Sequence, residues 1–113
     1  MQHQALENGR WAELTFPQQM ANIGSETSRI YKALEAGKEA RAESAFARFQ
    51  ELVDLTIKYG RIDASPILRS AMLEELCRLR EFYCKAFIER NLVELAAYNR
   101  YLDHFALCKG CFC

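Results

Sequence analysis

Apolar residues recur three and four positions apart in four successive segments of this sequence. Three of the segments run from Ala42 to Ile57, from Leu68 to Phe87 and from Leu95 to Phe105. In the segment before them a single hydroxyl, that of Thr27, interrupts the apolar series Met20, Ile23, Thr27, Ile30 and Leu34. A stripe with this period occupies one face of an α-helix and must be buried against another element. The pattern therefore predicts an all-α fold built from four amphipathic helices.

Helix-capping residues mark the ends of the first two helices. Thr15 and Gln18 form the pattern of an N-terminal capping box. The first helix is therefore predicted from Phe16 to Ala36, with Gly37 as a left-handed C-terminal cap. The second helix follows after almost no loop and ends at Gly60. So short a connection predicts that the two helices pack antiparallel.

A third helix is predicted after a linker over residues 61–64. Ser65 and Pro66 pair an N-terminal cap with a favoured first helical residue, and the apolar stripe continues to about Glu89. The break before the fourth helix contains neither glycine nor proline, so only the cap pattern that starts at Asn91 marks it. Without this break, the last two helices would merge into one rod that buries its stripe only by pairing with a second chain. Both alternatives remain open from the sequence.

Length and composition fit one globular domain. The chain has 113 residues, of which 50% are apolar and 27% charged, which supports one hydrophobic core. Four helices with short connections predict an up-and-down antiparallel four-helix bundle over residues 1–113. A polar leader is expected over residues 1–14 and a cysteine-rich tail over residues 108–113.

Charge and cysteine content limit which cellular environment and which partners are expected for this protein. The formal net charge is zero, so no overall field attracts nucleic acid, and a local basic patch is the alternative. No apolar run approaches the ~20 residues that cross a membrane, and the start lacks the apolar segment of a secretory signal. The five cysteines, three of them at the end, are not the framework of a secreted disulfide protein. We therefore expect a cytoplasmic protein with reduced thiols and no membrane partner.

The C-terminal segment carries the sharpest local motif. His104, Cys108, Cys111 and Cys113 place four zinc-type ligands close together. A closed zinc site usually draws its ligands from two elements, whereas these come from one helix end and a short tail. Incidental thiols, a dithiol pair and a zinc site are the alternatives. We expect no cofactor, with zinc as the alternative.

Arg100 and His104 are the candidate catalytic residues of another alternative. The segment from Arg100 to His104 resembles the Arg-to-His motif of the HEPN class of small helical proteins, which includes RNases and toxin components. It departs from that motif because only three residues separate the pair and Tyr101 follows the arginine. The resemblance implies RNA cleavage, whereas a solvated helix face is the other interpretation. The sequence holds no nucleophile elbow, phosphate loop or Glu-x-x-His pair, so we expect no conventional enzyme.

One carboxylate falls within an apolar stripe. On a helical wheel, Glu75 lies among the core positions of the third helix, so it should be buried and should bind a partner such as Arg78 or Arg29. The first helix offers Asn22, Glu26 and Arg29 on one shoulder of its stripe. These five residues are predicted to form a buried polar network, with a binding site as the alternative.

Gly24 stands in the middle of the first helix, where glycine costs about 1 kcal/mol relative to alanine. It predicts the close approach of a neighbouring backbone, from this chain or from a second copy.

The stretch from Gln19 to Glu26, preceded by Trp11 and Leu14, resembles the opening of a group of short uncharacterised bacterial proteins. The resemblance extends to Arg78-Leu79-Arg80-Glu81, and it implies a small helical bundle of bacterial source without an established activity.

These observations favour a non-enzymatic protein-interaction or scaffold module that forms a homodimer. Aromatic side chains at Trp11, Phe105 and Phe112 are expected to offer contact surface to a partner chain. The alternatives are a nuclease-like protein and metal-dependent assembly through the tail.

Overall fold

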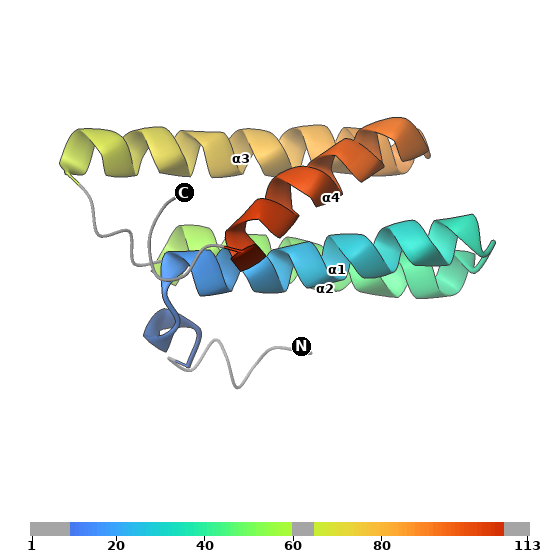
Figure 1. Ribbon diagram of the computed structural model, residues 1–113, viewed down its shortest axis with the longest axis horizontal. Helices are drawn as coiled ribbons and strands as arrows, with labels where there is room; N and C mark the ends of the chain where they lie inside the picture. Colours follow the sequence, from blue (N-terminus) through green and yellow to red (C-terminus); the bar gives the residue numbers. More distant parts are fainter. Residues whose placement is uncertain (1–9, 60–64, 108–113) are drawn as a thin grey trace.

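The computed structural model describes residues 10–59 and 65–107, and four α-helices make up most of them. They are α1 (Phe16–Glu35), α2 (Glu39–Tyr59), α3 (Pro66–Ile88) and α4 (Leu92–Leu107), preceded by a short 3-10 helix, η2 (Trp11–Glu13). Figure 1 shows that successive helices run in opposite directions. The predicted up-and-down four-helix bundle is confirmed, and none of the described residues forms a strand. Within these residues, no helix combines the length and the apolar character that a bilayer crossing requires.

The four helices do not contact one another equally. α1 makes the most extensive contacts, along α2 on one side and with α4 on the other, whereas α3 contacts α2 and α4 more sparsely. In Figure 1, α4 crosses the bundle obliquely, so it lies near α3 at their shared corner and near α1 at its other end. The outer flank of α3 is therefore left open.

Local capping interactions explain where the first helices begin and end. Thr15 Oγ1 accepts the backbone N–H of Gln18 at 3.2 Å, and Gln18 Oε1 accepts the backbone N–H of Thr15 at 2.8 Å. The predicted capping box is therefore confirmed. Gly37 adopts a φ of +72°, the left-handed conformation expected after α1. Ser65 Oγ accepts the N–H of Leu68 at 3.3 Å and caps α3.

Helices α3 and α4 are separate, so the merged rod does not occur. Arg90 has a φ of +54° and ends α3. The N–H of Asn91 donates to the carbonyl oxygen of Ala86 at 2.9 Å, which closes the turn. The side chain of Asn91 accepts the N–H of Glu94 at 3.2 Å, which confirms the predicted cap of α4.

The core lies where the four stripes meet. One buried residue from each helix is at most 6% exposed: Ile23, Phe49, Leu79 and Leu102. Aromatic rings join α2 to α3, because the ring centroids of Phe46 and Phe87 lie 4.0 Å apart and those of Phe49 and Tyr83 lie 4.4 Å apart. The first pair is stacked and the second is tilted, and together these ring contacts offset the sparse contacts that α3 makes elsewhere.

The residues just before α1 belong to the core, contrary to the sequence prediction. Trp11 is 1% exposed, and its indole N–H donates to Thr56 Oγ1 of α2 at 3.1 Å. Its carbonyl oxygen accepts the side-chain amide of Gln19 at 2.9 Å. The expectation that Trp11 offers contact surface is wrong, because α2 supplies both an apolar wall and an acceptor for the indole. From Trp11 onward the predicted leader is part of the fold, whereas residues 1–9 and Phe112 lie outside the described residues, as does the side chain of Phe105.

Gly24 lets α1 and α4 approach closely. A Cβ atom at this position would lie 3.2 Å from Leu102 Cβ and 3.7 Å from the carbonyl oxygen of Leu102. The neighbouring backbone that the sequence predicted therefore belongs to this chain. The hydroxyl of Thr27 donates to the carbonyl oxygen of Gly24 at 2.9 Å, so this polar member of the first stripe is satisfied within its own helix.

Candidate functional site

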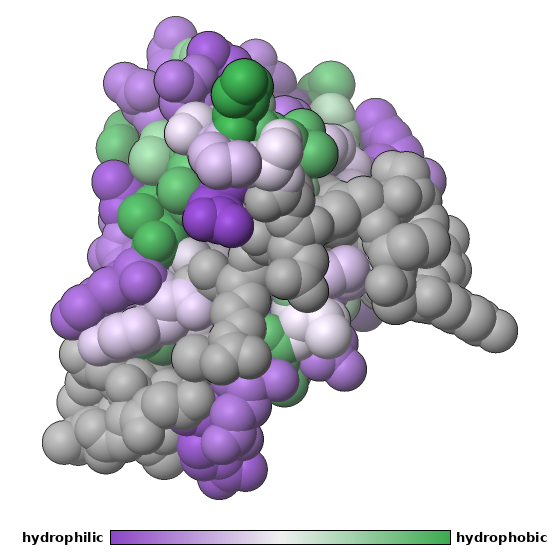
Figure 2. Space-filling model, turned by 90° about the vertical axis from the view of Figure 1, so that its left-hand side faces the viewer, coloured by the Kyte–Doolittle hydropathy of each residue, from purple (hydrophilic) through white to green (hydrophobic). Residues whose placement is uncertain are grey.

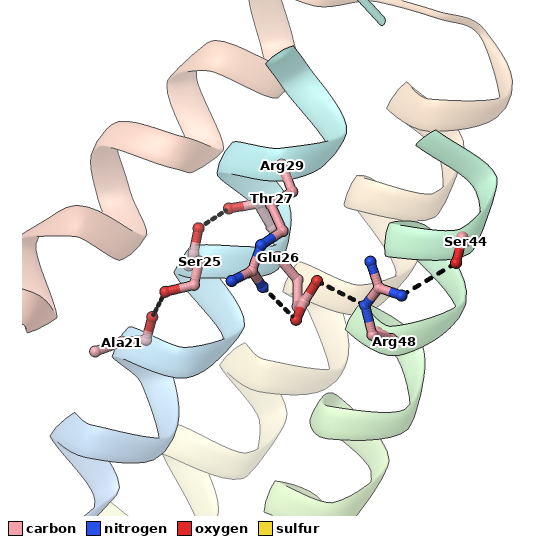
Figure 3. A network of polar contacts seen from close by, with 8 residues as sticks. Ala21, Ser25, Glu26, Thr27, Arg29, Ser44 and Arg48 are labelled. Carbon is pink, nitrogen blue, oxygen red and sulfur yellow. Dashed lines mark hydrogen bonds and ion pairs between the residues drawn. The ribbon is translucent and has the colours of Figure 1, made fainter. Parts of the chain in front are cut away.

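A buried carboxylate joins α1 to α2. Glu26 is 5% exposed, and its two oxygens accept hydrogen bonds from two different arginines. Arg29 Nη1 donates to Oε2 at 2.8 Å, and Arg48 Nε of α2 donates to Oε1 at 3.2 Å. Figure 3 shows the carboxylate lying between these two guanidinium groups, with Arg48 also donating to Ser44 Oγ at 3.0 Å. The arrangement satisfies a buried charge that would otherwise be costly.

A basic hollow opens beside this carboxylate, between α1 and α2. Its volume is about 460 Å³, and its floor is made of alanines, of which Ala33 is 4% exposed and Ala45 0%. Five cationic side chains line it: Arg29, Lys32, Lys38, Arg41 and Arg48. We call this feature the basic hollow.

Two of the cations in the basic hollow, Arg29 and Arg48, share the single negative charge of Glu26, and the other three form no ion pair with it. Within the described residues, no ion pair is formed by Lys32, Lys38 or Arg41. On the α4 side, a smaller hollow of about 330 Å³ shares Arg29 and Lys32 and is also lined by Asp103. The unneutralised charge is therefore concentrated at the α1–α2 turn.

A second hollow, of about 450 Å³ and with aromatic side chains in its lining, lies between α3 and α4. It is lined by Glu75, Arg78 and Phe82 from α3 and by Tyr98 and Tyr101 from α4. We call it the α3–α4 groove.

Glu75 and Tyr101 bridge the α3–α4 groove. The Tyr101 hydroxyl donates to Glu75 Oε1 at 3.1 Å. Partial burial of the phenol, together with the neighbouring Glu75 carboxylate, raises the pKa of Tyr101 from 10.0 to about 12. The phenol therefore stays neutral, and stays a hydrogen-bond donor, over the whole physiological range.

The structure does not bring the five residues of the predicted polar network together. Glu26 and Arg29 meet, but Glu75 is exposed on α3 and bonds to α4, so its predicted burial is wrong. Arg78 lies 3.9 Å from Glu74 on the exposed surface of α3. Asn22 is exposed and donates to the carbonyl oxygen of Gln18, one turn earlier in α1, at 2.8 Å. The helical wheel misplaced Glu75 because α4 diverges from α3 and leaves this flank uncovered.

The other candidate residues lie at the end of α4. Arg100 and His104 are both exposed on this helix, one turn apart, so the RNase alternative stays a prediction from the sequence. Cys108, Cys111 and Cys113 lie outside the described residues, and the predicted zinc ligands are therefore not placed as a group. Cys77 and Cys84 of α3 are free thiols.

Sequence reasoning missed most of the basic hollow. Arg41, Ala45 and Arg48 stand four and three residues apart on α2, a spacing that places two arginines over a small residue on one helix face. This signal was available from the sequence. The opposing contribution of Lys32 from α1 was not, because it depends on how the two helices face each other.

Comparisons of the chain with protein families, with curated proteins and with solved structures gave no match. The resemblances noted in the sequence therefore stay predictions, and the function is argued from geometry.

Proposed function

We propose that this protein is a non-enzymatic protein-interaction module that self-associates through the face formed by α3 and α4. The observation that carries the proposal is the α3–α4 groove, in which Phe82 is 49% exposed and Tyr101 is 39% exposed. Leu68, on the same flank of α3, is 51% exposed. Figure 2, which views the molecule from the end where α3 begins, shows green, apolar side chains among purple ones in its upper part. Clustered apolar side chains on an open face are typical of association surfaces.

The open flank of α3 is self-complementary, which favours a second copy of this chain as the partner. Its exposed residues recur at intervals of three and four: Leu68, Ala71, Glu75, Arg78 and Phe82. Two such flanks can run antiparallel about a twofold axis that passes between Glu75 and Arg78. Each Glu75 then faces the Arg78 of the second copy, and each Phe82 faces the small Ala71. Isologous contacts of this kind are the commonest in homodimers.

Sedimentation velocity over a range of concentrations tests the proposal. Wild-type protein should self-associate, and Phe82→Glu should remove the self-association because it puts an unpaired charge in the contact. Phe82 is half-exposed, so the substitution should leave the helical circular dichroism unchanged. Ile88→Glu is the matched control, since Ile88 is 72% exposed on a different face of α3. A wild-type protein that stays monomeric, or an equal effect of both substitutions, would contradict the proposal.

A homodimer, a cytoplasmic location and a bacterial source are expected from the sequence, and all three stay predictions. Of these, only the homodimer is supported by the exposed apolar flank of α3.

A further inference from the structure

The basic hollow between α1 and α2 lies apart from the α3–α4 groove and plays no part in self-association. Its cations are contributed by α1, by the connection to α2 and by α2 itself. Arg29 and Arg48 stand at one end, where both bind Glu26. Lys38 and Arg41 stand at the other end, at the turn where α1 ends and α2 begins.

So many like charges in one hollow repel one another and need an explanation in a chain of zero net charge. Glu26 offsets one unit of positive charge within the described residues. Lys32, Lys38 and Arg41 have no acidic partner among the described residues. An anion in the hollow would remove this repulsion and would bind to side chains that are already gathered.

The dimensions of the basic hollow define the size of that anion. Arg29 of α1 and Ala36, the C-terminal cap of that helix, are seven residues apart, which corresponds to about 10 Å along the helix axis. The volume of about 460 Å³ falls within the range of small-molecule sites, and the alanine floor leaves room for a ligand between the long cationic side chains. A single monovalent anion would meet only part of this array.

The chemistry of the lining defines the class of anion. Guanidinium groups match the geometry of phosphate oxygens, and lysines add further positive charge. Among the described residues that line the hollow none is aromatic, so it offers no platform on which a base could stack. Recognition therefore depends on the phosphate groups themselves.

We propose that the basic hollow binds a small anion that carries two or more phosphate groups. Arg29, Lys32 and Arg48 hold one end of the anion, and Lys38 and Arg41 hold the other. Glu26 fixes Arg29 and Arg48 in position and tempers the positive charge at its end of the hollow.

Isothermal titration calorimetry of the full chain with tripolyphosphate, at low ionic strength, tests the proposal. Tripolyphosphate should bind more tightly than inorganic phosphate and should raise the melting temperature. The double variant Lys32→Gln/Arg41→Gln should weaken binding by about tenfold or more, because it removes two ligands. Neither residue makes an ion pair within the described residues, so the fold should be retained.

Lys58→Gln/Lys85→Gln is the matched control, because it removes the same charge from exposed positions outside the basic hollow. Its affinity for tripolyphosphate should equal that of the wild type. Glu26→Gln keeps a side-chain oxygen that can accept a hydrogen bond from one of the two arginines and removes the negative charge beside the hollow, so it should strengthen binding, whereas a purely structural role would only lower stability.

Three results would overturn the proposal. The first is no detectable heat or thermal shift with tripolyphosphate. The second is an equal loss of affinity in both double variants, which would mean that binding follows net charge alone. The third is a single-stranded RNA oligonucleotide that binds more tightly than tripolyphosphate and is displaced by it, which would assign the hollow to nucleic acid. None of these results depends on self-association, which sedimentation measures separately.

Discussion

The hydroxyl of Tyr83 is buried between α2 and α4 and has no hydrogen-bond partner among the described residues. Burial is also the main reason why the pKa of Tyr83 is raised. Tyr83→Phe keeps the ring contacts with Phe49 and Tyr98 and removes the unsatisfied hydroxyl. We expect this variant to be more stable than the wild type by about 1 kcal/mol in urea denaturation. A loss of stability would show that the hydroxyl has a partner.

Gly24 is tested by adding a single methyl group. Alanine favours the helix by about 1 kcal/mol, but its Cβ would lie 3.2 Å from Leu102 Cβ in the core. Overpacking of this kind costs about 1–3 kcal/mol, so Gly24→Ala should lower the free energy of unfolding by about 1 kcal/mol. Ser28→Ala, on the same helix and only half-buried, should cause no loss. Equal behaviour of the two variants in thermal denaturation would mean that α4 moves freely away from α1.

Tyr101 should make the free energy of unfolding fall as the pH becomes alkaline. Its folded pKa of about 12 exceeds the ordinary value of 10.0, so between these values the unfolded chain loses a proton that the folded chain keeps. The stabilisation that the folded state gains from this difference in pKa is complete below pH 10 and is lost as the pH rises towards 12. Tyr101→Phe should show a shallower loss of stability over this interval, measured by urea denaturation. Tyr83 also contributes in both proteins, because its pKa is raised too.

The Tyr101 titration has an independent spectroscopic check. The ultraviolet absorbance of tyrosinate should show a late step in the wild type that is absent from Tyr101→Phe. Glu75→Gln should shift this step to lower pH, since the carboxylate contributes to the raised pKa. A titration unaffected by either substitution would contradict the assignment.

At the scale of elements, the corner between α3 and α4 depends on one residue in the left-handed conformation. Arg90 adopts it without being glycine, and its guanidinium binds Glu39 of α2 at 2.7 Å and lies 4.3 Å from the centre of the Phe87 ring. These contacts bring the corner against the start of α2 and offset the backbone strain. The corner is therefore held by tertiary contacts.

Substitution of Arg90 by glycine and by alanine separates the side-chain contacts of Arg90 from the strain of its left-handed backbone. Both variants lose the contacts with Glu39 and Phe87, but only alanine retains the strain of the left-handed conformation. Arg90→Ala should therefore be less stable than Arg90→Gly by about 1 kcal/mol in chemical denaturation. An alanine variant as stable as the glycine variant would mean that the corner rearranges.

At the scale of the whole molecule, α3 is the helix with the weakest attachment. All residues from Ser65 to Ala71 are exposed, and the first buried residue of α3 is Leu76. Native-state hydrogen exchange should therefore find the amides of residues 69–73 less protected than those in the middle of α1 and α2. This protection should increase with protein concentration if a second copy covers α3. Uniform protection along all four helices would contradict the weak attachment.

The sequence by itself determined the four helices and most of their ends. Capping at Thr15, Ser65 and Asn91 and the left-handed Gly37 involve atoms within a few residues of one another, and such interactions are written into local spacing. Periodicity likewise identified the core, because an apolar stripe must be buried whatever covers it.

Only the tertiary structure decided which polar groups were buried and where charges gathered. Glu26 and Glu75 both stand beside apolar stripes, yet Glu26 is enclosed by Arg48 of α2, whereas Glu75 stays exposed. The difference arises because α1 packs along α2, whereas α4 crosses obliquely and leaves one flank of α3 open. The burial of Trp11 and the basic hollow have the same origin: each depends on the side chains that a neighbouring helix presents, which no single segment of sequence encodes.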